Sequence, residues 1–210
     1  YGNVSMCITN GRGVACMLLQ FSCSNHKSIK DRVTFSTIAG SDNTFENTLR
    51  PFSNIRVMRS AVIYGANGSG KSNFISALEF MRNLVSNSIH HQPGQAVFQA
   101  PHKLNSSQVP SEYDIQFVKN DIRYAYGFSI VNNLVQSEYL YFFPKGRQVK
   151  IFERENMEIK PGDKYKNAFE LSLGVLKENR LFLSCAANYT NIHEIEEAFL
   201  FFSEDIVVYN

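Results

Sequence analysis

The chain has 210 residues, of which 44% are apolar and 19% are charged, and its formal net charge is +2. At this length folding buries roughly 70% of the surface of the unfolded chain, so one domain with its own core is expected without a metal or disulfide staple. Every apolar run is far shorter than the ~20 residues of a membrane-spanning helix, and the first residues contain no signal-peptide core. We therefore expect a cytoplasmic protein with no membrane partner.

The cysteines argue against a metal or disulfide framework. Cys7, Cys16, Cys23 and Cys185 include no C-x-x-C pair, which is the spacing common to zinc and redox sites. We predict that they are reduced and mostly pack in the core. The net charge is also too small to predict a nucleic-acid partner, because such proteins concentrate basic residues on one face.

The first 16 residues differ in composition from the rest of the chain. Residues 1–16 are rich in Gly, Asn, Ser and Thr without a sustained period, so they are predicted to be an extension that is disordered or lies upstream of a natural start at Met17. Residues 17–210 are predicted to form the folded domain. Within it, residues 18–21 and 32–36 have the pattern of a two-stranded hairpin, and residues 40–54 that of a loop.

A strand, a glycine-rich turn and a helix are predicted in residues 57–88. Residues 57–64 end in an apolar run without alternation, which is typical of a parallel strand buried on both faces. From Ser72 onward apolar residues recur at steps of three and four, which predicts an amphipathic helix that ends near residues 86–88. Its predicted buried face consists of Phe74, Ala77, Leu78, Met81 and Leu84 or Val85.

The second half of the chain changes from a loop to an antiparallel meander. Residues 88–111 hold three of the five His and three of the six Pro, a composition that favours a surface excursion. In residues 112–155 apolar and polar residues alternate with period two between turns at residues 119–121, 132–133 and 144–146, which predicts an antiparallel β-subdomain. Residues 171–183 and 192–202 are predicted helices, and residues 206–209 are predicted to open another strand.

A phosphate-binding motif lies between the predicted strand and the predicted helix. Residues 65–72 read Gly-Ala-Asn-Gly-Ser-Gly-Lys-Ser and satisfy the pattern G-x-x-x-x-G-K-[ST]. The glycines let backbone N–H groups surround phosphate oxygens, and the start of the helix adds the positive end of its dipole. Lys71 is expected to reach the β- and γ-phosphates, and the Ser72 hydroxyl is an oxygen ligand suited to Mg²⁺.

The loop and two other segments resemble a known family. The loop, together with Asn73, Ala77-Leu78 and Phe80, resembles the Walker A segment of ABC-type ATPases of the SMC, RecF and OLD group. The turn at residues 24–29 is similar to the N-F-[RK]-S-[FIL] hairpin that begins those ATPases, with His26 where an aromatic residue is usual. Residues 113–154 resemble the inserted β-meander of bacterial AAA family ATP-binding proteins related to OLD and RloC.

This resemblance implies an α/β fold, namely a P-loop NTPase that forms the N-terminal lobe of an ABC-type ATPase head with an inserted antiparallel β-meander. It implies ATP and Mg²⁺ as ligands, a homodimer or higher homo-oligomer formed through the heads, and a nucleic-acid-directed effector, in many members for defence against phage. The implied catalytic residue is Lys71 and the implied metal ligand is Ser72. The implied nucleotide-binding residues are Lys27, Ser28, Asn67, Gly68, Ser69, Gly70, Lys71, Ser72 and Asn188.

Three of these residues have particular roles in the resemblance. Lys27 and Ser28 correspond to hairpin residues near the base or the α-phosphate. Asn188 stands where the family usually has a Gln that senses Mg²⁺ and the attacking water. The family also uses a Leu-Ser-Gly-Gly signature, a pair of carboxylates and a switch His for hydrolysis.

Those additional motifs are not present in their expected form. Residues 171–174 and the pair Glu204-Asp205 can be assigned to the signature and the carboxylates, but a leucine and a serine interrupt the two patterns. Their context favours two structural helices. We therefore expect the catalytic motifs downstream of Asn210 and hydrolysis to be shared with a second copy.

Two other function classes compete with an ATPase. One is a regulatory module that binds the nucleotide without turning it over and holds an assembly in one state, and the other is a nucleic-acid-binding protein whose loop is incidental. The aromatic alternation in residues 113–128 is interpreted as a buried sheet face, because no row of Lys or Arg accompanies it. His90, His91 and His102 are interpreted as residues of a solvated loop and not as metal ligands. Lys27, Lys30 and Arg32 are interpreted as a solvated basic cluster and not as a phosphate-backbone contact.

Overall fold

The fold, taken from a computed structural model, is described for residues 5–8, 16–41 and 46–209. Its strands are β1 (Ser5–Ile8), β2 (Cys16–Ser24), β3 (Val33–Ser36), β4 (Leu49–Phe52), β5 (Ile55–Met58), β6 (Ser111–Lys119), β7 (Ile122–Val131), β8 (Leu134–Phe143), β9 (Val149–Glu155), β10 (Glu158–Pro161) and β11 (Ile206–Tyr209). Its α-helices are α1 (Lys71–Asn87), α2 (Glu170–Val175), α3 (Phe182–Tyr189) and α4 (His193–Leu200). Short helical turns are η2 (Glu46–Thr48), η3 (Ser88–His90), η4 (Pro144–Gly146), η5 (Asp163–Tyr165) and the π-helical η6 (Phe201–Asp205).

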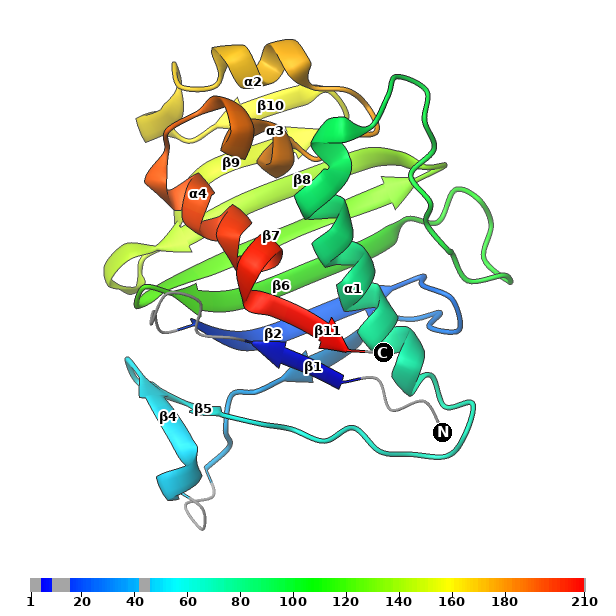
Figure 1. Cartoon of the computed structure of the whole chain (residues 1–210), viewed down its shortest axis with the longest axis vertical. Helices are drawn as coiled ribbons and strands as arrows, with labels where there is room; N and C mark the ends of the chain where they lie inside the picture. Colours follow the sequence, from blue (N-terminus) through cyan, green and yellow to red (C-terminus); the bar gives the residue numbers. More distant parts are fainter. Residues whose placement is uncertain (1–4, 9–15, 42–45, 210) are drawn as a thin grey trace.

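A seven-stranded antiparallel sheet forms the centre of the molecule, in the order β10-β9-β8-β7-β6-β2-β3. The helices cover one of its faces (Figure 1). The side chains that alternate along β6 and β7 toward this face are buried, and Tyr113, Tyr124 and Tyr126 are fully inaccessible to solvent. The interpretation of the aromatic alternation as a buried sheet face is therefore confirmed, and the predicted meander strands extend the sheet that β2 and β3 begin.

Helix α1 lies across the covered face of this sheet (Figure 1). The structure confirms the predicted helix, because every apolar residue at its three- and four-residue steps is buried. Burial of one such side chain stabilises the fold by about 1.5–3 kcal/mol, so this face fixes the helix on the sheet. Its buried residues are Phe74, Ala77, Leu78, Met81, Leu84 and Val85.

The turns of the meander are confirmed as well. Asn120 and Asp121, and likewise Asn132 and Asn133, have positive φ angles, as a two-residue type I′ hairpin turn requires. The next turn passes through η4, where Lys145 and Gly146 also have positive φ. Strand β10, which the sequence did not predict, pairs with β9 and ends the sheet.

The expectation for the first 16 residues is wrong for five of those that the structure describes, because residues 5–8 form β1 and Cys16 is the buried first residue of β2. Strand β1 pairs antiparallel with β11, with Ser5 opposite Tyr209 and Ile8 opposite Ile206. The predicted strand at residues 206–209 is thus confirmed, and its partner comes from the segment predicted to be an extension. A pairing over so large a sequence separation leaves no local signal. Residues 1–4 and 9–15 lie outside the described residues.

The prediction of a buried parallel strand over residues 57–64 is also wrong. Strand β5 ends at Met58 and pairs antiparallel with β4, so part of the predicted loop at residues 40–54 is a strand. Val57 packs against Met17, Leu19 and Val118 in a second, small core. Residues 59–64 have no regular structure, and the exposed fractions of Val62 and Tyr64 are 82% and 88%. An apolar run becomes a central strand only where other strands pair with it, and no described strand pairs with this run.

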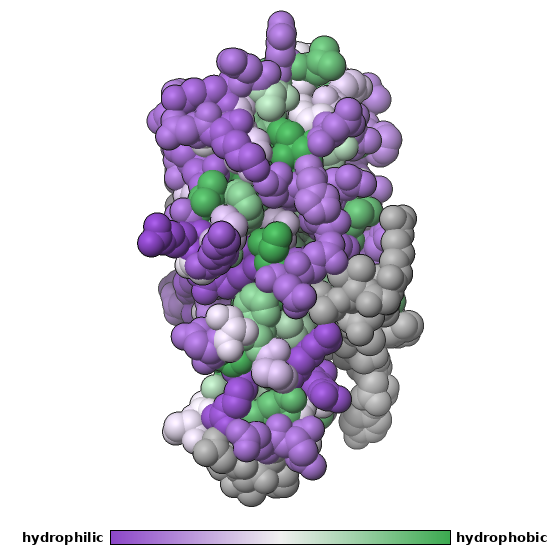
Figure 2. All heavy atoms as spheres, turned by 90° about the vertical axis from the view of Figure 1, so that its left-hand side faces the viewer, coloured by the Kyte–Doolittle hydropathy of each residue, from purple (hydrophilic) through white to green (hydrophobic). Residues whose placement is uncertain are grey.

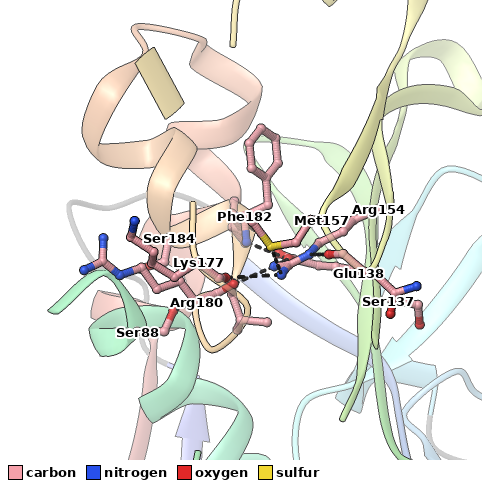
Figure 3. A network of polar contacts seen from close by, with 12 residues as sticks. Ser88, Ser137, Glu138, Arg154, Met157, Lys177, Arg180, Phe182 and Ser184 are labelled. Atoms are coloured by element: carbon pink, nitrogen blue, oxygen red, sulfur yellow. Dashed lines mark hydrogen bonds and ion pairs between the residues drawn. The ribbon is translucent and has the colours of Figure 1, made fainter. Parts of the chain in front are cut away.

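The single helix predicted over residues 171–183 is divided into α2 and α3. Arg154 donates to the backbone carbonyls of Lys177 and Arg180, which holds the intervening loop out of helical geometry. Glu138 accepts the N–H groups of Phe182 and Leu183 at the start of α3. Figure 3 shows Glu138 and Arg154 pointing toward this loop. The other predicted helix, over residues 192–202, is confirmed as α4 and continues into η6.

Figure 2 shows that the face on the left of Figure 1 is mostly hydrophilic, with apolar residues scattered among the polar ones. Across the described ranges, no helix is both long and apolar enough to cross a membrane. Cys16, Cys23 and Cys185 are buried in the core, as predicted, and burial raises the pKa of Cys23 and of Cys185 to about 12. Cys7 lies in β1.

Candidate functional site

The glycine loop, residues 65–70, leads from the exposed segment 59–64 into α1. Gly68 and Gly70 have φ angles of 81° and 93°, a left-handed region that side-chain-bearing residues rarely adopt. The N–H of Ser69 donates to the Ala66 carbonyl at 3.2 Å and closes a turn within the loop. The sequence places glycine at the two positions where this loop needs left-handed backbone.

The first turn of α1 has the properties of an anion-binding site. Gly70 is the N-cap residue, and no side chain caps the helix. No acidic residue lies in the first turn either. The first N–H groups of a helix have no partner within the helix, and they lie at the positive end of its dipole. An anion such as a phosphate is the partner that satisfies both the donors and the dipole.

Lys71 adds a positive charge to this loop. Its Nζ donates to the carbonyl oxygens of Gly65 and Ala66, at 2.7 and 2.8 Å, and lies 3.4 Å from the Ser69 hydroxyl. These acceptors are neutral, so phosphate oxygens would bind the ammonium more strongly in their place. Ser72, the next residue, is exposed at the start of the helix, and its hydroxyl is of the ligand type that Mg²⁺ prefers.

The turn between β2 and β3 brings a second predicted segment to this loop. The Ser28 hydroxyl accepts a hydrogen bond from Asn73 Nδ2 at 2.6 Å, and a Cβ placed on Gly70 would lie 3.4 Å from Ser28 Oγ. Lys27 precedes Ser28 with an exposed side chain, and its N–H donates to the Ala100 carbonyl. The structure thus places Ser28 beside the start of α1 and Lys27 next to it.

Asn188, in contrast, is not brought to the loop. It lies in α3, where its Nδ2 donates to the Ser184 carbonyl. The Ser184 hydroxyl in turn accepts the N–H of Ile89, just beyond the C-terminal end of α1. Because α1 has 17 residues, roughly 25 Å of helix separates that end from the glycine loop. A role for Asn188 at the phosphates stays a prediction without a contact to support it.

The alternative assignment of the hydrolysis motifs also has no geometric support at the loop. Asp205 is buried and pairs with Lys119, with 2.6 Å between Nζ and Oδ2. Cys16 Sγ donates to the same carboxylate at 3.5 Å. Residues 171–174 lie in α2, at the opposite end of the molecule from the start of α1 (Figure 1). The interpretation of these segments as structural agrees with where they lie.

His26 is the residue of this site that sequence reasoning missed. Its ring nitrogens Nδ1 and Nε2 lie 2.8 Å from the Tyr113 hydroxyl and 2.9 Å from the Ser76 hydroxyl. The side chain is buried, and burial together with the charge of Lys27 lowers the pKa of His26 to about 4. It is therefore neutral at pH 7. The available signal was a histidine at a position where the resemblance of residues 24–29 leads to the expectation of an aromatic residue.

The other histidines do not form a metal site. His91 Nδ1 lies 2.9 Å from the Asn179 carbonyl, and His102 contacts Asn25 through its backbone N–H. No three His, Cys, Asp or Glu side chains come together as metal ligands in the part of the chain that the structure describes. The geometry thus supports one chemical task above others, which is the binding of a polyphosphate at the loop and the first turn of α1.

Comparison with known proteins agrees with this geometry. Residues 60–193 match the model of a family described as "AAA domain, putative AbiEii toxin, Type IV TA system". The match covers more than half of the 210 residues and includes the glycine loop, α1 and the meander strands β6–β9. No curated protein matches the chain.

Proposed function

The chain belongs to this family of AAA domains, and from that premise we propose that it binds MgATP at residues 65–72. The observation that carries the proposal is the combination found at the start of α1. There the helix has no side-chain cap, left-handed Gly68 and Gly70 precede it, and the Lys71 ammonium lies among the carbonyls of the loop. Each feature favours the binding of a phosphate group, and together they form a binding site for a triphosphate.

Each residue of the loop has a role in this proposal. The N–H groups from Asn67 to Gly70 surround the α- and β-phosphates. The Lys71 ammonium donates to β- and γ-phosphate oxygens in place of the loop carbonyls that it contacts without a ligand. Ser72 supplies a hydroxyl ligand to the metal. A Mg²⁺ ion held there with ATP would neutralise part of the phosphate charge. Ser28 and Lys27 flank the binding site from the β2–β3 turn.

We further propose that hydrolysis, where it occurs, is shared between copies of the chain. The loop residues 65–69 are exposed, which leaves the γ-phosphate side open to a second head. Lys71 stabilises negative charge on the γ-phosphoryl group while water attacks it, and it thereby acts as the catalytic residue. Nucleotide-dependent pairing of heads would then drive a nucleic-acid-directed effector, with defence against phage as the biological setting.

Equilibrium binding of a fluorescent ATP analogue tests the central proposal. We expect binding that weakens at least tenfold when Mg²⁺ is removed or in Lys71→Ala, because Lys71 contributes charge-assisted hydrogen bonds to the phosphates. Lys160→Ala is the matched control, since Lys160 is an exposed lysine in β10, at the opposite edge of the sheet from β3. Equal affinity in the wild type and Lys71→Ala would refute the proposal.

Phosphate release distinguishes turnover from binding alone. We expect the isolated chain to bind MgATP with little steady-state hydrolysis, and the hydrolysis to rise with protein concentration where copies pair. Robust hydrolysis that is independent of concentration would show that a single copy holds the complete catalytic machinery. Hydrolysis that rises with protein concentration would favour an ATPase over the alternative, a nucleotide-sensing module that binds ATP without turnover.

A further inference from the structure

The turn between β2 and β3 is held from two sides. On one side Asn25, which is buried with a φ angle of 51°, donates to the Val109 carbonyl and accepts the N–H of His102. On the other side the turn contacts the first two turns of α1 through the Asn73–Ser28 hydrogen bond and through His26. The turn therefore cannot shift relative to the glycine loop unless these bonds break.

His26 is the buried centre of the contact with α1. Ser76 donates its hydroxyl hydrogen to the Asn73 carbonyl at 3.2 Å, so its oxygen is left to accept from His26 Nε2–H. Nδ1 then accepts from the Tyr113 hydroxyl, an assignment that satisfies both nitrogens of a neutral imidazole. The chain of hydrogen bonds runs from β6 through His26 to α1. It continues from Asn73 to the Ser28 hydroxyl beside Gly70.

The hydrogen bonds of the His26 ring, and not only its packing, connect the β2–β3 turn to α1 and β6. The ring also packs against Phe80 and Tyr113, with centroid distances of 6.1 and 5.7 Å. A phenylalanine would fill that aromatic position equally well. It would, however, leave the hydroxyls of Ser76 and Tyr113 without these partners, and an unpaired buried hydroxyl is unfavourable.

We propose that His26 is a positioning residue of the nucleotide site, which fixes Ser28 and Lys27 against the first turn of α1 so that they contact the bound nucleotide. This inference rests on the proposed function, because it concerns the same loop and the same ligand. His26 does not touch the nucleotide in this arrangement. Its effect on binding passes through the two residues that follow it in the turn.

A double-mutant cycle with ATP affinity as its readout tests this role. His26→Phe keeps the aromatic packing and removes both hydrogen bonds, and we expect it to weaken MgATP binding five- to tenfold. In the background Lys27→Ala/Ser28→Ala, where the positioned side chains are absent, we expect the same substitution to change the affinity less than twofold. A purely structural role would give the same factor in both backgrounds.

Two further variants keep the test clear of folding effects. Ser76→Ala removes the α1 partner of Nε2 together with the hydrogen bond from Ser76 to the Asn73 carbonyl, and it leaves the His26 ring in place. We expect it to weaken binding two- to fivefold, so the inference can be tested even where His26→Phe does not fold. Ser22→Ala is the matched control, because it breaks the 2.9 Å hydrogen bond between Ser22 and Thr34 in the same hairpin without touching α1. It should leave ATP affinity unchanged.

The outcomes separate this inference from the proposed function. If the wild-type chain does not bind MgATP, the proposed function is wrong and the positioning role is wrong with it. If the wild type binds and His26→Phe binds with the same affinity, only the positioning role is wrong. Equal losses in the two backgrounds, or a loss in Ser22→Ala as large as in Ser76→Ala, would also overturn it.

Discussion

The two ends of helix α1 are held in different ways. Just beyond its C-terminal end, the Ser88 hydroxyl accepts the N–H of Leu181 at 3.0 Å, and the Ser184 hydroxyl accepts the N–H of Ile89 at 3.1 Å. The Arg180 guanidinium donates two hydrogen bonds to the His91 carbonyl. Ser88 and Ser184 are fully buried. This end has no donor or acceptor to offer a ligand among these groups, because they satisfy one another.

The N-terminal end is held more sparsely. The side-chain bonds from its first two turns to the sheet hairpin are Asn73 to Ser28 and Ser76 to His26. Residues 61–69 in front of it are exposed, and the backbone N–H groups of the first turn have no side-chain cap. One end of the helix is thus fixed by internal polar contacts, and the other end leaves its backbone donors to a ligand.

Glu138 caps α3, whose Ser184 holds the chain just beyond the C-terminal end of α1. Its carboxylate accepts the N–H groups of Phe182 and Leu183 and the Tyr126 hydroxyl, and lies 3.5 Å from Arg154 Nη1 (Figure 3). Both side chains of the ion pair are fully buried. Burial raises the pKa of Glu138, and the charge of Arg154 and the two N–H groups act against that rise.

Glu138→Ala should therefore lower the free energy of unfolding strongly. It leaves the Arg154 guanidinium buried without its anion and α3 without its cap, and loss of one partner of a buried pair costs about 3–5 kcal/mol. Urea denaturation followed by circular dichroism measures this loss. Glu153→Ala is the matched control, because its pair with Lys150 at 3.0 Å is about 40% exposed, and such pairs contribute about 0–1 kcal/mol. Similar losses in the two variants would contradict the assignment.

Low pH should destabilise the contacts at the N-terminal end of α1, because it favours protonation of His26. Its pKa is about 4 in the folded protein, against an ordinary value of 6.5, so the unfolded chain binds a proton more readily between these values. The free energy of unfolding should accordingly fall as the pH drops from 6.5 toward 4, by up to ~3 kcal/mol from this residue. Below pH 4 its contribution levels off. Denaturation midpoints at intervals of half a pH unit measure the slope.

His26→Phe isolates that contribution from the other titrating groups. The variant should lose stability overall, but its free energy of unfolding should vary less with pH between 6.5 and 4 than that of the wild type. His91→Phe serves as the comparison, because His91 is only partly buried. If the wild type and His26→Phe have parallel pH profiles in this window, His26 does not titrate as its burial requires.

The sequence predicted the parts of the fold whose signals are local. Helix α1 and the meander were predicted because each has one buried face, and the period of apolar residues reports such a face directly. The glycine loop was predicted because its motif is contiguous and its glycines have a backbone role. The division between α2 and α3 could not be predicted, because it depends on Glu138 and Arg154, more than 20 residues away.

Long-range pairing explains the remaining errors. Strand β1 pairs with β11 at the other end of the chain, and the apolar run at residues 61–64 has no strand partner among the described residues. In the candidate site, Ser28 was expected near the phosphates from family resemblance alone. His26 was not, because its partners Ser76 and Tyr113 lie 50 and 87 residues away and show no motif.

The left-handed backbone at Gly70 can be tested by a single substitution with a matched control elsewhere in the chain. Gly70 and Gly94 have similar left-handed φ angles, 93° and 75°, and a Cβ would meet Ser28 Oγ at 3.4 Å at the first and nothing within 4 Å at the second. Alanine in this region costs about 1–2 kcal/mol, so we expect comparable losses of stability for Gly70→Ala and Gly94→Ala.

The two variants should differ in nucleotide binding. Gly70 is the N-cap of α1 and lies between the loop and Ser28, so its substitution should weaken MgATP binding at least tenfold. Gly94, in the loop after η3, should tolerate alanine with unchanged affinity. Thermal denaturation and ATP titration of the same samples give both quantities. Because the backbone penalty is matched, a loss of affinity confined to Gly70→Ala reports the ligand's need for the loop geometry, whereas equal affinities would place the phosphate site elsewhere.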